Sequence, residues 1–277
     1  MDWPPFQDWL SRTSLLAIAA TLFVAMCAAA ASGTVLRERR KRRARQKGDD
    51  KDGGQEAYIV SAVLGLLALL LGFTFSLAVE RFEARRNLVL QEANAIGTAY
   101  LRAQLLAEPH RTRLAGLLVR YTDNRILLAK AKPGQSRGLL AQNDALLTDI
   151  WAATSAAFDS IKASPFSATF LDSVNAVIDL DSARKAARTA RIPPEVFIVL
   201  FVYLITTAGV LGYVLKGIEG RFAAGFLLAL LTLSFTLIVD IDRPVLGGIT
   251  ESQRPMEELR KSLAAQPPAV FDKWRAR

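Results

Sequence analysis

The chain has 277 residues, of which 51% are hydrophobic, and it carries a net charge of +9 at pH 7. A single cysteine, Cys27, excludes an internal disulfide. The positive charge indicates either nucleic acid or an anionic membrane surface as a partner. Because the apolar residues are concentrated in four blocks, we favour the membrane and expect no nucleic-acid partner.

The four apolar blocks cover residues 15–36, 58–79, 196–215 and 222–239. Each block is close to the ~20 residues that an α-helix needs to cross a bilayer. A signal peptide is the competing interpretation of the first block, but its N-terminal flank has two acidic residues and only one arginine, so we predict an uncleaved span. The third and fourth blocks are joined by only six residues, which predicts an antiparallel hairpin.

A strongly basic segment, residues 37–47, follows the first block and has eight basic residues among eleven. In isolation such a cluster would be typical of nucleic-acid binding or nuclear localisation. Directly after a span, it is expected to contact anionic lipid headgroups. The residues assigned to this contact are Arg37, Arg39, Arg40, Lys41, Arg42 and Arg43.

The segment from residue 80 to 195 has a helical pattern throughout. No Gly or Pro interrupts residues 80–86, so the second span is predicted to continue as a helix into this segment, as far as Pro109. Three more helices are predicted, over residues 111–132, 139–161 and 166–178, with Ser164 as a cap before the last. Helices joined by short turns predict a helical bundle.

The sequence therefore predicts an all-α, multi-pass membrane protein with four transmembrane helices and a helical-bundle extramembrane domain between the second and third. Its parts are the first transmembrane segment (1–36), a basic loop (37–57), the second span (58–79), the helical domain (80–195), the transmembrane hairpin (196–241) and a C-terminal tail (242–277). The tail contains a short amphipathic helix from Pro255, and residues 266–268 are expected to be poorly ordered.

The residues available for catalysis are few. His110 is the only histidine, and no GxSxG motif, phosphate-binding loop or Cys/His metal spacing is present. We therefore expect neither an enzyme nor a bound metal or cofactor. The carboxylates of Glu83 and Glu92 lie among arginines on one predicted helix and are expected to form solvated pairs, such as Glu83 with Arg86.

The apolar blocks carry no ionisable residue in their interior. Proton-coupled carriers usually keep such residues at membrane depth. A pore built from these blocks would be an apolar constriction that is gated by wetting. Arg81, Arg85 and Arg86, which follow the second block, would raise the local concentration of anions at one mouth of the pore.

Residues 72–82, GFTFSLAVERF, resemble the end of the pore helix in bestrophins. The stretches EANAIGTAYLR (92–102) and DIDRP (240–244) are similar to those of a bacterial family described as bestrophin-like, and the resemblance covers residues 58–259. The motif positions are Glu92, Asn94, Asp240, Asp242, Arg243 and Pro244.

This resemblance implies a pentamer that passes chloride or other small anions along its central axis, with the second span lining the pore. Gly65, Leu69 and Phe73 then stand where bestrophins place their apolar neck. The chain departs from the family pattern in two places. A single ring, Phe82, replaces an aromatic pair, and the acidic cluster that binds calcium in animal bestrophins is mostly missing after Asp242, so calcium gating is not expected.

Two orientations remain open. Bestrophins keep both termini and the helical domain in the cytoplasm, whereas the positive-inside rule places the basic loop 37–47 in the cytoplasm and the domain 80–195 in the periplasm. We expect the protein in the cell (inner) membrane, with charge favouring a periplasmic domain. The alternative function is that of a membrane-anchored sensor or scaffold, whose helical bundle binds a ligand or partner without transport.

Overall fold

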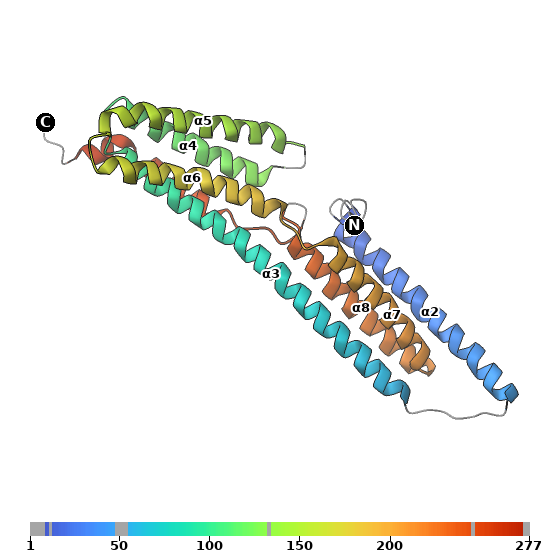
Figure 1. The fold of residues 1–277 in the computed structure, drawn as a ribbon. Coiled ribbons are helices and arrows are strands. Elements are labelled where there is room, and N and C mark those ends of the chain that lie inside the picture. The colour runs from blue at the N-terminus through green and yellow to red at the C-terminus, as the bar shows by residue number, and fades with distance from the viewer. Residues whose placement is uncertain (1–8, 11–12, 48–54, 132–133, 245–246, 274–277) are drawn as a thin grey trace. The chain divides into compact units, whose positions relative to one another are not determined.

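The computed structural model describes residues 9–10, 13–47, 55–131, 134–244 and 247–273. The regular elements among these residues are all helices, with no strand. The all-α prediction is therefore confirmed (Figure 1). In chain order the elements are α2 (Leu15–Lys47), α3 (Gln55–Ala103), α4 (His110–Lys130), α5 (Ser136–Ile161), α6 (Phe166–Thr189), α7 (Pro194–Val214), α8 (Gly217–Asp242), α9 (Arg254–Ala265) and the short 3-10 helix η1 (Pro268–Asp272).

The chain forms two compact units. The first unit comprises residues 1–82 and 190–250, and the second comprises residues 83–189 and 251–277. Helix α3 begins in the first unit and ends in the second. It passes the boundary at Phe82 and Glu83 without a break, because residues 73–96 contain no Gly or Pro. The predicted continuity of this helix is thus confirmed as far as Ala103.

In the first unit, α2, α7 and α8 pack side by side (Figure 1). Four helical stretches of the described chain are long and apolar enough to cross a membrane, which agrees with the four predicted spans. The link between α7 and α8 consists of Leu215 and Lys216 only, because Gly217, with φ +70°, already opens α8. The buried core between these helices includes Leu22, Met26, Leu204 and Phe235.

Helices α2 and α7 approach closely at glycines. A Cβ atom added to Gly212 would lie 2.6 Å from the carbonyl carbon of Ala30, and one added to Gly33 would lie 2.9 Å from the Tyr213 nitrogen. In both cases the obstacle is backbone rather than a side chain that can move. Small residues are the usual means by which membrane helices bring their backbones together.

We predict that Gly212→Ala lowers the stability of the purified protein by about 1–3 kcal/mol, because the added methyl group overpacks a helix contact that cannot relax. Thermal unfolding in detergent measures the effect. Gly225→Ala, on α8, is the matched control, since no atom lies within 4 Å of a Cβ added there. Equal melting temperatures for the two variants would show that the α2–α7 contact is not close-packed.

The second unit is a helical bundle built from the C-terminal part of α3 together with α4, α5, α6 and α9. Its core contains Ile96, Leu118, Ile150 and Phe170, all fully buried or nearly so. The bounds of α4 and α5 lie within three residues of those expected from the sequence, whereas α6 continues eleven residues beyond the expected range 166–178. The Phe166 N–H donates a hydrogen bond to Ser164 Oγ at 3.2 Å, as expected for the cap before α6.

The C-terminal end of the described chain corrects one expectation. Residues 266–268 were expected to be poorly ordered, but Tyr100 Oη donates a hydrogen bond to the Gln266 carbonyl at 2.8 Å, and η1 follows at Pro268. In η1, Asp272 pairs with the buried guanidinium of Arg111 at 2.5 Å. Local composition gave no sign of these partners, because both lie more than 150 residues earlier in the chain.

Candidate functional site

The three residues predicted to form a pore neck lie on one exposed face of α3. Gly65, Leu69 and Phe73 are spaced four residues apart, so they form a stripe along the helix. The exposed fractions of Leu69 and Phe73 are 55% and 63%. The inward side of the same helix carries Leu67 and Ala78, which are fully buried. The structure therefore brings the predicted neck residues together and leaves their face uncovered within one chain.

The neck stripe, as we call Gly65, Leu69 and Phe73, lies in a stretch without ionisable residues. Beyond it, Arg81 is half-buried, and Arg86 is exposed and pairs with Glu83 at 3.2 Å. The prediction of a solvated Glu83–Arg86 pair is confirmed. Such a pair is separated by three residues on a helix and contributes little to stability.

Arg85 differs from its two neighbours because it is buried. Its Nε donates to Glu251 Oε1 at 2.5 Å, and both side chains are almost completely shielded from solvent. Arg85 thus connects α3 to the segment before α9 within the second unit, and Glu251 neutralises its charge. Of the three arginines predicted at a pore mouth, only Arg81 and Arg86 retain exposed surface.

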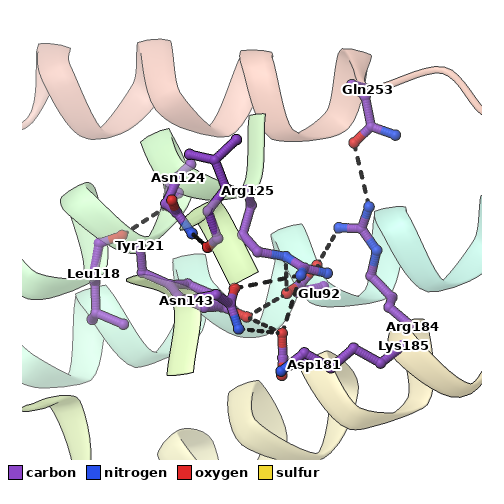
Figure 2. A network of polar contacts seen from close by, with 12 residues as sticks. Glu92, Leu118, Tyr121, Asn124, Arg125, Asn143, Asp181, Arg184, Lys185 and Gln253 are labelled. Carbon is purple, nitrogen blue, oxygen red and sulfur yellow. Dashed lines mark hydrogen bonds and ion pairs between the residues drawn. The ribbon is translucent and has the colours of Figure 1, made fainter. Parts of the chain in front are cut away.

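Glu92 lies at the centre of a buried polar network in the second unit (Figure 2). Its carboxylate is 0% exposed and accepts hydrogen bonds from Tyr121 Oη at 2.6 Å, from Arg125 Nη2 at 3.2 Å and from Arg184 Nη1. The sequence-based expectation of a solvated carboxylate is therefore wrong for Glu92. Its partners come from α4 and α6, at distances of 29 to 92 residues along the chain.

Asp181 is the second buried carboxylate of this network, which we call the Glu92 network. It accepts from Arg125 Nη1 at 3.1 Å and from Asn143 Nδ2 at 2.9 Å, and it pairs with Lys185 at 2.7 Å. Arg125 thus bridges the two carboxylates (Figure 2). Charges buried in this way are tolerated only when they are paired and hydrogen-bonded, so the network fixes how α3, α4, α5 and α6 meet.

Burial raises the pKa of Tyr121 well above its ordinary value, and the negative charge of Glu92 acts in the same direction. Tyr121 is therefore neutral in the folded protein and can donate its hydroxyl proton to Glu92. By contrast, a hydrogen bond from Lys185 lowers the pKa of Asp144, which lies at the exposed edge of the network. Tyr121 thus takes part in the network as a hydrogen-bond donor.

The raised pKa of Tyr121 predicts a loss of stability at alkaline pH. The contribution of neutral Tyr121 is complete below its unfolded pKa of about 10 and decreases as the pH rises beyond that value. Tyr121→Phe removes this contribution, so the difference in melting temperature between the native protein and the variant should narrow above about pH 10. A difference that stays constant up to about pH 11 would contradict the prediction.

Three of the remaining motif residues, Asp240, Asp242 and Arg243, make structural contacts. Asp240 Oδ1 accepts from the Gly248 N–H at 2.6 Å, and Asp242 Oδ1 accepts from the Ile192 N–H at 3.1 Å. Arg243, the residue before Pro244, is buried, and its Nη1 donates to the Thr13 carbonyl at 2.9 Å. These contacts tie the end of α8 to the segments before α7 and α2. Asn94 is exposed on α3.

The basic residues predicted to contact lipid headgroups lie in the continuation of α2. Arg39, Arg40, Lys41, Arg42 and Arg43 are exposed, and Arg37 is half-buried. Arg40 Nη1 donates to the hydroxyl of Tyr213 on α7 at 2.8 Å. Among the described residues, no group of three His, Cys, Asp or Glu side chains is arranged to hold a metal ion.

Four long apolar helices and a polar helical bundle define a multi-pass membrane protein. The family model of the Bestrophin-like domain matches residues 23–256, and the chain belongs to this bestrophin-like family. The resemblance inferred from the sequence motifs is thereby confirmed.

Solved structures agree with the family assignment. The fold is similar to that of a variant of a bacterial bestrophin homologue from Klebsiella pneumoniae, with a TM-score of 0.64, 18% sequence identity, and coverage of 88% of this chain and 97% of the homologue. A second variant of that homologue gives a TM-score of 0.62 and 19% identity, with coverage of 91% and 98%. At these identities the similarity concerns the fold. A search of the curated proteins gives no match.

Proposed function

We propose that the protein is an oligomeric channel through which small anions, such as chloride, cross the inner cell membrane passively. The observation that carries this proposal is the exposed, uncharged neck stripe on α3 in a chain of the bestrophin-like family. Bestrophins are anion channels, and the resemblance implies a pentamer. The proposed function therefore involves permeation and no catalysis.

The neck stripe has the properties that an apolar constriction requires. Copies of α3 arranged around a central axis would present Leu69 and Phe73 as rings, with Gly65 allowing close approach of the helices. An apolar ring blocks ions when it is dry and conducts when it is wetted. The spans contain no ionisable residue that could couple transport to protons, which supports passive flux.

Reconstitution of the purified protein into planar bilayers tests the proposal. Its oligomeric state is first established by native mass spectrometry. Under a gradient of potassium chloride, the reversal potential should then lie close to the equilibrium potential of chloride. A verified oligomer that conducts no ions, or one whose reversal potential follows potassium, would contradict the proposal.

The second candidate function is a membrane-anchored sensor or scaffold. The basic segment after the first span favours it, because the positive-inside rule then places the helical domain in the periplasm, opposite to the bestrophin orientation. A reporter inserted at Gly134, in the exposed turn between α4 and α5, would decide the orientation. A cytoplasmic reporter supports the channel, and a periplasmic one supports the sensor. Gly48, a second position suited to a reporter, lies outside the described residues.

A further inference from the structure

A cavity of about 380 Å³ lies in the first unit, where the basic part of α2 passes the turn between α7 and α8. Five of the side chains that line it are cationic and only one, Glu38, is acidic. The cations are Arg37, Arg39 and Arg42 from α2, and Lys216 and Arg221 from the turn and the start of α8. We call this the basic cavity.

The fold brings these five cations together for local reasons. The close contact of α2 and α7 at Gly33 and Gly212 fixes how the two helices run next to each other. The hydrogen bond from Arg40 to Tyr213 holds α2 in register with α7 at the level of the cavity. Gly217, with its positive φ, then returns the chain so that Arg221 faces the same space.

Like charges gathered in one cavity repel each other, and an anion bound among them removes that repulsion. Arginine is the side chain best suited to phosphate, because its planar guanidinium can donate two parallel hydrogen bonds. The start of α8 at Gly217 adds the positive end of a helix dipole. The chemistry of the basic cavity is therefore that of a phosphate site.

An apolar groove of about 390 Å³ continues from the basic cavity between α2 and α8. The two share Thr34, Gly212, Leu215 and Arg221 as lining residues. The rest of the groove is lined by small or apolar residues, namely Cys27, Ala30, Ala31, Leu211, Gly220, Ala224, Gly225 and Leu228. A charged end and an uncharged continuation thus form one surface along α2, α7 and α8.

We propose that the basic cavity and the apolar groove form a binding site for an anionic phospholipid. Its phosphate lies among the five cations and an acyl chain lies in the groove. A free phosphate would use the cavity alone, so the groove is the feature that favours a lipid. The proposed site does not depend on ion conduction. Arg37, Arg39 and Arg42 line the cavity, whereas the neighbouring Lys41 and Arg43 do not.

The test measures binding to the full-length protein in detergent by native mass spectrometry, with three probes: phosphatidylglycerol, phosphatidylcholine and inorganic phosphate. Phosphatidylglycerol should bind more tightly than either of the others. Arg221→Gln or Arg42→Gln should weaken phosphatidylglycerol binding roughly five- to tenfold. Lys41→Gln and Arg43→Gln are matched controls on the same helix and should change it little.

Gly225→Leu separates a lipid site from a phosphate site. No atom lies within 4 Å of a Cβ added at Gly225, so the leucine side chain can fill the groove without disturbing the backbone. It should weaken phosphatidylglycerol binding while leaving phosphate binding unchanged. Arg221→Lys keeps the positive charge and should retain most of the phosphatidylglycerol binding. That result would show that Arg221→Gln weakens binding because the charge is lost, and not because the protein is misfolded.

Three results would overturn the proposal. Equal losses in the cavity variants and in the Lys41→Gln and Arg43→Gln controls would mean a general attraction to a basic surface. Equal binding of phosphatidylcholine and phosphatidylglycerol would show that the five cations do not select for an anionic headgroup. Phosphate binding as tight as that of phosphatidylglycerol, together with an unaffected Gly225→Leu variant, would indicate a site for a soluble phosphate.

Discussion

Replacing Phe73 by alanine is expected to raise the conductance of the reconstituted protein several-fold. The Phe73 ring is 63% exposed on α3 and carries no polar atom, so in the proposed neck it keeps the constriction narrow and poorly hydrated. Alanine widens the constriction and lowers the cost of wetting. A decrease of about 1.4 kcal/mol in the barrier to permeation corresponds to about a tenfold increase in the rate.

Phe226 provides the matched control for this experiment. It is also a phenylalanine of a membrane helix, and its exposed fraction of 66% is nearly the same, but it lies on α8. Phe226→Ala should leave the conductance unchanged, because α8 is not the helix that lines the proposed pore. If Phe226→Ala and Phe73→Ala gave the same increase, the neck stripe would have no special role.

Replacing Glu92 by glutamine is expected to be the most destabilising of the conservative substitutions in the second unit. The variant leaves the buried Arg184 without its carboxylate partner, and it leaves Arg125 with Asp181 as its one remaining carboxylate in the Glu92 network. Loss of one partner of a buried ion pair costs about 3–5 kcal/mol. In a thermal unfolding experiment this corresponds to a decrease in melting temperature of roughly 10 °C.

Two further variants show whether the loss comes from the buried charges. Glu83→Gln removes a carboxylate from the same helix, but its pair with Arg86 is solvated, so the melting temperature should change little. Combining Glu92→Gln with Arg184→Gln should recover part of the loss, because one uncompensated cation is removed. Additive effects of the two substitutions would contradict a direct interaction between Glu92 and Arg184.

The features of the fold that depend on local pattern could be predicted from the sequence. The four spans follow from the length of the apolar blocks, and the helices of the second unit follow from their periodicity and from turns such as that at Ser164. The continuity of α3 past Glu83 follows from the absence of Gly and Pro in residues 73–96. Helical periodicity also places Gly65, Leu69 and Phe73 on one face.

The contacts that depend on tertiary packing could not be predicted. The Glu92 network joins residues of four helices, and Arg85 meets Glu251 at a separation of 166 residues, so one sequence contains no local sign of either contact. Both involve charged residues whose usual place is the solvated surface. The order of the chain around Gln266 has the same origin, since it depends on Tyr100 of α3.

The basic segment after the first span shows how structure sharpens a sequence-based prediction. From the sequence, all the cations of this segment are predicted to contact lipid headgroups in the same way. The structure places Arg42 in a cavity with Arg221 and leaves Lys41 outside that cavity. Neighbouring residues with the same charge therefore have different surroundings, because successive side chains of a helix point about 100° apart.

Access of a charged, water-soluble thiol reagent to position 73 tests most directly whether α3 lines an ion path. Cys27 is the only cysteine, so Cys27→Ala provides a cysteine-free background for Phe73→Cys. In a planar bilayer, the reagent should change the chloride current of the Phe73→Cys protein within the recording and should leave an equivalent Phe226→Cys protein unaffected. A current that is unchanged in both variants, with the oligomer verified, would contradict the proposed pore.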